Sequence, residues 1–515
     1  MTHYRADGTV APSPEHVAPH PFGHPRERTP KGHTGPAIGA PAVGPRTHMS
    51  VFQLAMLTVV AVASLRSLPA MAGYGLASVF LFVVPAVLFL LPTALVAAEL
   101  ATGWKGGIYV WVSEAFGQRW GFLAIWLQWI QNVVWYPTQI AFIAVSLSYV
   151  VDGQLSSSGL YTAVVIIVLY WGSTLISLRG GSLFAKVGSW SGLIGTLFPG
   201  LLLIILGAVW LATGQHSQTS LSGSAVLPAW TGVASIVLVV SNVLAYAGME
   251  VNAVHANDLK DPGRGFPKVM LVSTLLILGV FILPTVAIAV AVPSSKLGVI
   301  NGINLAFDQF FTHWRLGWAT SVISLLIALG AFASVVTWIA GPSRGLLAAA
   351  RSGLLPPALQ YRNKAGVQVG ILMVQGTIVT VLALLFIIIP NGNTAFVTLV
   401  DMATALYLIM YVLMFASALR LRRIHPEVRR SYRAPAIKLT ASVGLGASAA
   451  AFVMAFVRPS GFTGLSAVSY PLVVAVVVFL LGAPPLVFYA LRKPAWDLRP
   501  EEERETAENV LVNAQ

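Results

Sequence analysis

Residues 241–268 read SNVLAYAGMEVNAVHANDLKDPGRGFPK. The stretch begins as an apolar helix, places Glu250 at the depth of a membrane centre, and ends in a charged Pro-Gly turn. A carboxylate inside a membrane span is costly and usually serves a function. Gly248 lowers helix propensity by roughly 1 kcal/mol relative to alanine, which favours a break in the helix there. The alternative is a tightly packed glycine beside a glutamate paired with a neighbouring helix. These residues alone favour neither interpretation.

The composition of the whole chain is that of a polytopic membrane protein. Of its 515 residues, 56% are hydrophobic and only 10% are charged, whereas soluble domains carry about 25% charged residues. The mean hydropathy is +0.78. The chain has no cysteine, which excludes disulfides, thiolate metal sites and cysteine nucleophiles.

Apolar segments long enough to cross roughly 30 Å of hydrocarbon follow one another along the chain. They predict an all-α membrane protein with about twelve transmembrane helices. We expect these helices near residues 51–73, 77–98, 121–150, 160–178, 190–213, 231–256, 269–292, 316–341, 367–389, 394–419, 439–457 and 469–491.

Basic residues are concentrated in alternate connections between these segments. Connections 214–230 and 390–393 have no lysine or arginine, whereas the connection after the tenth segment holds seven basic residues between Arg420 and Lys438. The positive-inside rule therefore places both termini in the cytoplasm of a protein of the cell (plasma or inner) membrane. The net charge of +13 is thus a topology signal, and we expect no nucleic-acid partner.

The segments outside the apolar region are polar. Residues 1–48 are rich in proline and histidine and predict a disordered cytoplasmic tail. Its histidines follow no metal-binding spacing, so a solvated tail is favoured over a pH-sensing or metal-binding segment. Residues 49–493 form the predicted transmembrane domain, and 494–515 form a cytoplasmic C-terminal tail. Residues 103–118 are amphipathic and predict a short helix at the membrane interface.

Three groups of motifs resemble the amino acid–polyamine–organocation (APC) transporter superfamily. They are WKGGIYVW at 104–111 with EAFG at 114–117, YAGME at 246–250 with DPGR at 261–264 and Pro267, and GPSRG at 341–345 with GLLP at 353–356. Further motifs are most similar to the glutamate/γ-aminobutyrate antiporter family: HAND at 255–258, WIAGPSRG at 338–345 and HPE at 425–427. The likeness covers roughly residues 50 to 435.

The resemblance implies two inverted five-helix repeats, about 51–213 and 231–419, followed by two extra helices at about 439–491. The first and sixth spans would be interrupted at the substrate site. It also implies a secondary active transporter of amino acids or related amines that works by alternating access, with antiport as the first mechanism. Proton-coupled or facilitated transport of amino acids or polyamines is the alternative. We expect a monomer, with a dimer as the alternative.

Other classes of protein are less favoured by the sequence. A nutrient sensor with a transporter fold is a rival, in which the two tails would carry the signal. An ion channel is less favoured because no selectivity-filter sequence is present. Motifs for serine, zinc or nucleotide chemistry are missing from the sequence, so we expect neither an enzyme nor a cofactor.

An amino acid presents a carboxylate and an ammonium group to its site. The resemblance places the first break near residues 58–64, where amides around Val60, Ala61 and Ser64 would bind the carboxylate. This segment is β-branched, whereas the superfamily often has glycines there. The sixth-span candidates for binding the ammonium group are Ala245, Tyr246 and Gly248.

The third span adds polar residues to one helical face. Gln128, the adjacent pair Gln131 and Asn132, and Trp135 follow one another at intervals of three to four residues. Gln128 and Gln131 are candidates for the substrate pathway. Hydrogen bonding between helices is the alternative, particularly for Asn132.

The eighth and tenth spans contribute Ser334, Trp338 and Tyr407 as substrate-site candidates. Glutamate/γ-aminobutyrate antiporters are expected to have a glutamate where this chain has Ser334, and the difference bears on substrate charge and acid-gated exchange. Trp338 is equally consistent with packing. Tyr407 matches a family tyrosine near the substrate, while packing is an equal alternative for Tyr411.

Charged residues within or beside the spans complete the candidates. Glu250 and His255 are proposed as proton-linked or gating groups, with a structural role as the alternative for His255. Arg66 either attracts anionic substrates or extends to the membrane interface. Glu99 is expected to form a structural pair, and Asp401 is expected to be exposed to water.

Overall fold

A computed structural model of the chain describes residues 49–179, 193–230, 232, 237–253, 255, 258–351, 353–459 and 465–498. All of these belong to one unit of the chain, residues 37–515. Their regular elements are helices, accompanied by two isolated β-bridges, Met49–Leu259 and Arg362–Gln368. The predicted tail at 1–48 and the residues after 498 lie outside the described part.

Ten helices in the described part are long and apolar enough to cross a membrane. They are Gly75–Gly103, Gln118–Val151 (α6), Gly159–Leu178 (α7), Ile194–Ala212, Pro262–Ala291 (α12), Trp318–Ala350 (α14), Val369–Ile388, Gly392–Ile424 (α18), Ile437–Met454 (α19) and Ser469–Leu491. Each coincides with one of the segments expected from apolar length, and the prediction of an all-α membrane protein is confirmed.

Several of these spans are made of shorter consecutive pieces. Their bounds are η2 (Gly75–Ala77), α3 (Ser78–Pro85), η3 (Ala86–Leu90), α4 (Leu91–Gly103), η5 (Leu193–Leu197), α9 (Phe198–Ala212), α16 (Val369–Ala383), α17 (Leu385–Ile388), α20 (Ser469–Gly482) and α21 (Pro484–Leu491). Shorter helices between the spans are α5 (Ile108–Phe116), within the predicted amphipathic segment, α13 (Gly302–His313) and α15 (Pro357–Gln360).

The first and sixth expected spans are interrupted. The first consists of α1 (Val51–Val62), two extended residues, the 3-10 turn η1 (Leu65–Ser67) and α2 (Leu68–Ala72). The described part of the sixth consists of η8 (Val237–Val239), α10 (Val240–Tyr246) and α11 (Met249–Ala253). With these two, the structure accounts for the twelve expected segments. The inverted relation between the two halves remains a prediction.

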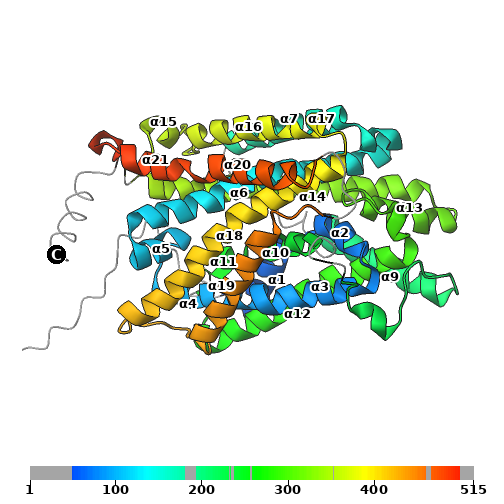
Figure 1. Ribbon diagram of the computed structural model, residues 1–515, viewed down its shortest axis with the longest axis horizontal. Coiled ribbons are helices and arrows are strands. Elements are labelled where there is room, and N and C mark those ends of the chain that lie inside the picture. The colour runs from blue at the N-terminus through cyan, green and yellow to red at the C-terminus, as the bar shows by residue number, and fades with distance from the viewer. Residues whose placement is uncertain are drawn as a thin grey trace, which may run out of the picture. The chain divides into compact units, whose positions relative to one another are not determined.

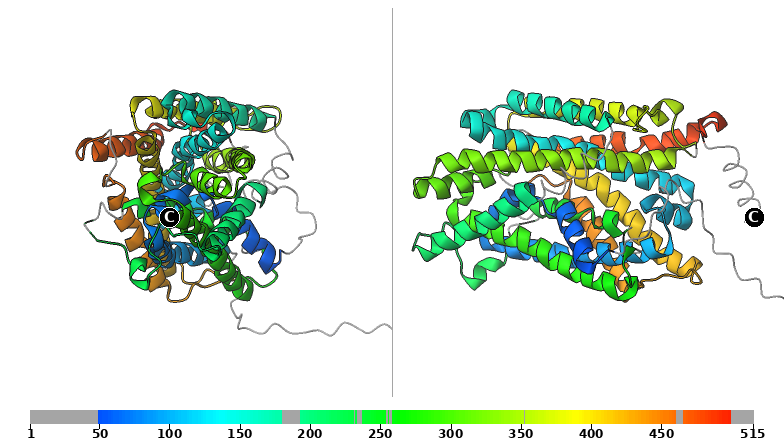
Figure 2. Two further views of the ribbon diagram at one scale, coloured as in Figure 1. Left: turned by 90° about the vertical axis from the view of Figure 1, so that its right-hand side faces the viewer. Right: turned by 180° about the vertical axis from the view of Figure 1, so that it is seen from behind.

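The interrupted helices lie between longer ones. The most extensive contacts between elements of the described part are those of α6 with α14 and with α18. Helix α1 packs against α12 and α11, while α10 packs against α18. Figure 1 shows α1, α10 and α11 between α6 and α12. The view from behind in Figure 2 shows the blue α1 beside the green α12.

The sixth span is fastened to α3 by side chains that bond to backbone carbonyls. Proline at position 85 has no N–H to donate to the carbonyl of Leu81, four residues earlier. The Nδ2 of Asn242 donates to that carbonyl at 2.9 Å instead. The hydroxyl of Tyr246 donates to the next carbonyl, that of Phe82, at 2.9 Å. Helix α10 is therefore held against α3 by two hydrogen bonds, and the bond from Asn242 supplies the donor that Pro85 cannot provide inside the membrane.

At one end of the bundle, Glu99 forms the structural pair expected from its position. The Nε and one terminal nitrogen of Arg422 donate to its two carboxylate oxygens at 2.6 and 2.9 Å. The Nε of Arg430 lies 3.5 Å from Oε1, and the backbone N–H of Ala434 donates at 2.7 Å. This buried cluster joins α4 to the end of α18 and to the segment that follows it.

Candidate functional site

The break in the sixth span depends on Gly248. Ala247 leaves the helix with an extended conformation, φ −67° and ψ 149°, and Gly248 has φ +108°. Residues with a Cβ atom rarely adopt such a positive φ, whereas glycine adopts it readily. The sequence therefore places glycine at the residue where the helix axis is interrupted, which agrees with the first of the two interpretations left open above.

Glu250 closes this break with its side chain. It is only 2% exposed, and Tyr407 and Tyr411 of α18 both donate hydrogen bonds to it, Tyr411 at 2.6 Å. The Nε2 of Gln128 on α6 donates to Oε1 at 3.2 Å. The backbone N–H of Gly248 donates to Oε2 at 3.1 Å. We call these five residues the Glu250 cluster.

The Glu250 cluster explains how a carboxylate is accommodated here. A buried carboxylate without donors would be strongly unfavourable, because it loses its hydration. Four donors, one of them the N–H freed by the break, replace that hydration. Hydrogen bonds to an ionised acceptor are roughly twice as strong as those between neutral groups. The cluster therefore ties the broken sixth span to α6 and α18. The helix break and the pairing of Glu250 with neighbouring helices are both present, whereas Gly248 is not tightly packed, since a Cβ there would meet Trp338 at 3.6 Å.

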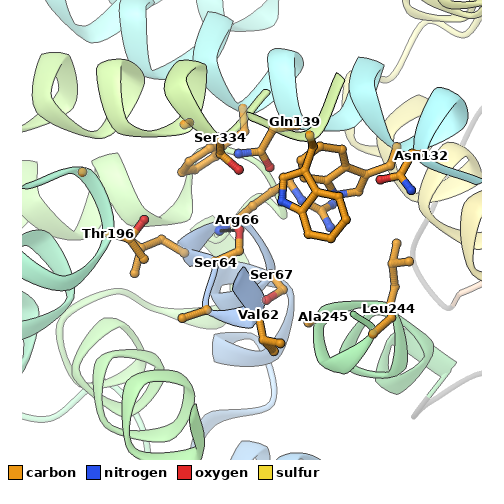
Figure 3. Close-up of a pocket in the computed structure, with 18 of the residues that line it drawn as sticks. Val62, Ser64, Arg66, Ser67, Asn132, Gln139, Thr196, Leu244, Ala245 and Ser334 are labelled. Atoms are coloured by element: carbon orange, nitrogen blue, oxygen red, sulfur yellow. Dashed lines mark hydrogen bonds between the residues drawn. The ribbon is translucent and has the colours of Figure 1, made fainter. Parts of the chain in front are cut away.

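A polar cavity of about 80 Å³ lies between the two interrupted spans. The first span contributes Val62 to Ser67, and the sixth contributes Leu244, Ala245 and Ala247. Helices α6 and α14 close the opposite side (Figure 3). The rings of Trp135 and Trp338 both line the cavity, with centroids 6.5 Å apart.

The structure brings several of the predicted site residues to this cavity. The candidates that line it are Ser64, Gln131, Ala245, Ser334, Trp338 and Tyr407. Ser334 therefore lies at the cavity although it is not the expected glutamate. Asn132 also lines it, while its Nδ2 donates to the carbonyl of Gln128 at 2.9 Å. The hydrogen bond of this Nδ2 group therefore lies within α6, whereas a bond between helices was the alternative considered for Asn132.

Other candidates lie elsewhere. Gln128 and Gly248 both donate hydrogen bonds to Glu250. The side chain of Tyr246 points toward α3, and its ring centroid lies 5.6 Å from that of Phe281. His255 is 43% exposed and bonds to Asp258 at 2.8 Å, away from the cavity. Val60 and Ala61 belong to the last turn of α1, and their side chains lie outside the described part.

Two cavity residues were missed or only partly recognised by sequence reasoning. Gln139 lines the cavity, and its buried Oε1 has no hydrogen-bond partner among the described residues. It lies one turn after Trp135, so extending the polar face of the third span would have found it. Arg66 is 4% exposed and also lines the cavity. Its side chain is buried at the cavity, which does not agree with the alternative of a side chain extending to the membrane interface.

In the tenth span the structure corrects the assignment of Asp401 and adds contacts for Tyr411, whose role was left open. Asp401 was expected to be exposed to water, but it is 3% exposed and accepts a hydrogen bond from Tyr470 of α20. An added helix covers this face, which the tenth span alone could not reveal. Tyr411 does more than pack, because its hydroxyl donates to Glu250 and accepts from the N–H of Gly248 at 3.1 Å. Within the described part, no three histidine or acidic side chains gather as a metal site requires.

Comparison with known proteins agrees with this architecture. The family model described as "Amino acid permease" matches residues 49–481. The chain belongs to the amino acid permease family. The predicted kinship with the APC superfamily is thereby confirmed, and the protein is a multi-pass membrane protein of a transporter family.

Individual relatives are similar over most of their length. An uncharacterised transporter of Legionella pneumophila is 41% identical over 418 residues, covering 80% of this chain and 90% of the relative. A glutamate/γ-aminobutyrate antiporter of Lactococcus lactis is 32% identical over 454 residues, covering 86% and 90%. A probable agmatine/putrescine antiporter of the same species is 26% identical over 387 residues, covering 74% and 81%.

The role of Gly248 can be tested by Gly248→Ala. A Cβ there meets Trp338 only at an ordinary 3.6 Å, so the effect would come from backbone strain, about 1 to 3 kcal/mol. We expect a lower melting temperature in fluorescence-detected size exclusion. The control is Gly279→Ala in α12, where a Cβ enters open space. Equal stability of the two variants would contradict this role for Gly248.

Proposed function

We propose that the protein is a secondary active transporter that exchanges amino acids or related amines across the cell membrane by alternating access. The observation that carries the proposal is the polar cavity enclosed by two interrupted spans. Interrupted helices near the midplane are where many secondary transporters bind their substrates. The similarity to a glutamate/γ-aminobutyrate antiporter and to a probable agmatine/putrescine antiporter supports exchange.

The geometry suits a molecule with an ammonium group and a carboxylate. Helices α1 and α10 both end at or beside residues that line the cavity, namely Val62 for α1 and Ala245 and Ala247 for α10. The last carbonyls of a helix lack partners within that helix and carry a partial negative charge, which favours an ammonium group. The backbone resumes as η1 on the other side of the first break, where N–H groups of a new helical segment would face a carboxylate.

The transport cycle would alter the packing of the interrupted spans around this site. The sixth span is fixed to α6 and α18 through the Glu250 cluster and to α3 through Asn242 and Tyr246. Alternating access in such folds is largely rocking of one bundle against the other around a fixed site. We further propose that the protein is a monomer in the cell membrane. The basic residues in alternate connections support an orientation with both termini in the cytoplasm.

Uptake into proteoliposomes tests the exchange mechanism. Labelled amino acids and amines would be offered to vesicles that are empty or preloaded with unlabelled substrate, at acid and neutral pH. We expect uptake into preloaded vesicles only, because each inward step would require an outward one, and protein-free vesicles are the control. Uptake into empty vesicles that follows an imposed proton gradient would replace exchange with symport. If folded protein transports none of the labelled compounds, the alternative of a nutrient sensor with a transporter fold would be favoured.

We also propose that Glu250 is the proton-linked group of the cycle. The titratable side chains that face it are Tyr407 and Tyr411. In Glu250→Gln an amide NH₂ would replace one acceptor oxygen and meet donors, so exchange should fall about tenfold or more. Its pH dependence should also disappear. The control is Glu114→Gln, the same change at an exposed position. An unchanged rate and an unchanged pH profile would eliminate this role.

A further inference from the structure

Arg66 carries a buried positive charge for which the structure provides little compensation. Its side chain belongs to η1 and is 4% exposed. Its Nε has no hydrogen-bond partner in the described part of the chain. Among the described residues, its guanidinium lies over one aromatic ring, that of Phe396, whose centroid is 5.4 Å from Cζ. A buried charge of this kind is costly unless an anion or several acceptors meet it.

The acidic side chains nearest to this region do not supply that anion. Glu250 is already occupied by the four donors of the Glu250 cluster. Asp401 shares a small void of about 10 Å³ with Arg66, but it accepts from Tyr470. No ion pair within 4.0 Å joins Asp401 to Arg66 among the described residues.

The open side of Arg66 is the cavity. Figure 3 shows Arg66 extending from the first span toward the side formed by Gln139 and Ser334. Among the described lining residues, Arg66 is the one that carries a formal charge. Gln139 presents an unpartnered buried carbonyl oxygen to the same cavity. The site therefore offers a cationic donor and a separate neutral acceptor, and it has no anionic group of its own.

We propose that Arg66 determines substrate specificity by binding a carboxylate of the substrate, so that the protein transports carboxylate-bearing amino acids and rejects diamines. This proposal rests on the transport function above. A guanidinium matches a carboxylate with two parallel hydrogen bonds. The ammonium group of the same substrate would bind Gln139 Oε1 and the carbonyls at the helix ends.

A diamine fits the same cavity poorly. It would bring two positive charges beside Arg66, in surroundings where water screens their repulsion less than in bulk. It would also leave the guanidinium without an acceptor. Rejection by an unpaired buried charge is an effective way to discriminate between ligands of similar size. Arg66 thus favours the substrate type named for the glutamate/γ-aminobutyrate antiporter over that named for the agmatine/putrescine relative.

Binding measured apart from transport tests the proposal. Purified full-length protein in detergent would be titrated with glutamate, γ-aminobutyrate and putrescine by calorimetry. We expect wild type to bind at least one of the carboxylates at least about 30-fold more tightly than putrescine, and Arg66→Gln to lose most of that ratio. Arg66→Lys keeps the positive charge but loses the paired guanidinium donors, so its affinity ratio should lie between those of wild type and Arg66→Gln. The control is Arg119→Gln, at an exposed arginine.

The affinity ratio is independent of how much protein is folded, so a destabilised variant remains informative. An unchanged ratio in Arg66→Gln, or wild type that binds putrescine as tightly as the carboxylates or binds none of the three, would overturn the proposal. If the variant loses carboxylate binding but wild-type vesicles show no exchange, the role of Arg66 in binding would be supported and the antiport mechanism contradicted. If wild-type vesicles exchange substrate and the Arg66→Gln variant keeps the wild-type selectivity, antiport would be supported and the role of Arg66 contradicted.

Asp401→Asn separates this role from a structural one. If Arg66 served only as the counter-charge of Asp401 across the small void, both single variants would lower the melting temperature and neither would change the ratio. We expect Asp401→Asn to retain the wild-type preference for carboxylates. Loss of that preference in Asp401→Asn to the same extent as in Arg66→Gln would contradict a direct contact between Arg66 and substrate.

Discussion

A helix can be interrupted inside a membrane only where other groups satisfy the backbone hydrogen bonds that the interruption frees. In this protein the N–H of Gly248 is bonded by both Glu250 and Tyr411. The same carboxylate is bonded by Tyr407 and Gln128. One buried side chain therefore stabilises the break and fixes its position against two long helices. Residues on the α10 side of this break, Leu244, Ala245 and Ala247, line the cavity.

The two pieces of the sixth span are anchored on different sides. Helix α10 is held by Asn242 and Tyr246, whose side chains bond to carbonyls of α3 beside its internal proline. Helix α11 is held by Glu250 to α6 and α18. The sixth-span residues that line the cavity, Leu244, Ala245 and Ala247, fall between Asn242 and Glu250 in the chain.

Apolar length and local propensity predicted most of the fold, but the site only in part. The break at Gly248 was one of two interpretations that the residues left open, and the resemblance to the APC superfamily placed an interruption in that span. The first break was not predictable from composition, since Thr58 to Ser64 contains no glycine, and its extended residues are Ala63 and Ser64. The environments of Arg66 and Asp401 depend on the helices that cover them, and the residues of those helices are distant in the sequence.

The central claim is that substrate occupies the cavity between the interrupted spans, and site-specific labelling tests it most directly. The chain has no cysteine, so Ser334→Cys would introduce a single thiol at the cavity and Ser157→Cys one on an exposed connection. Both would be labelled with a charged methanethiosulfonate in proteoliposomes. The account predicts that saturating transported substrate slows labelling at 334 and leaves 157 unaffected. Equal labelling at 334 with and without substrate, in an active variant, would contradict it.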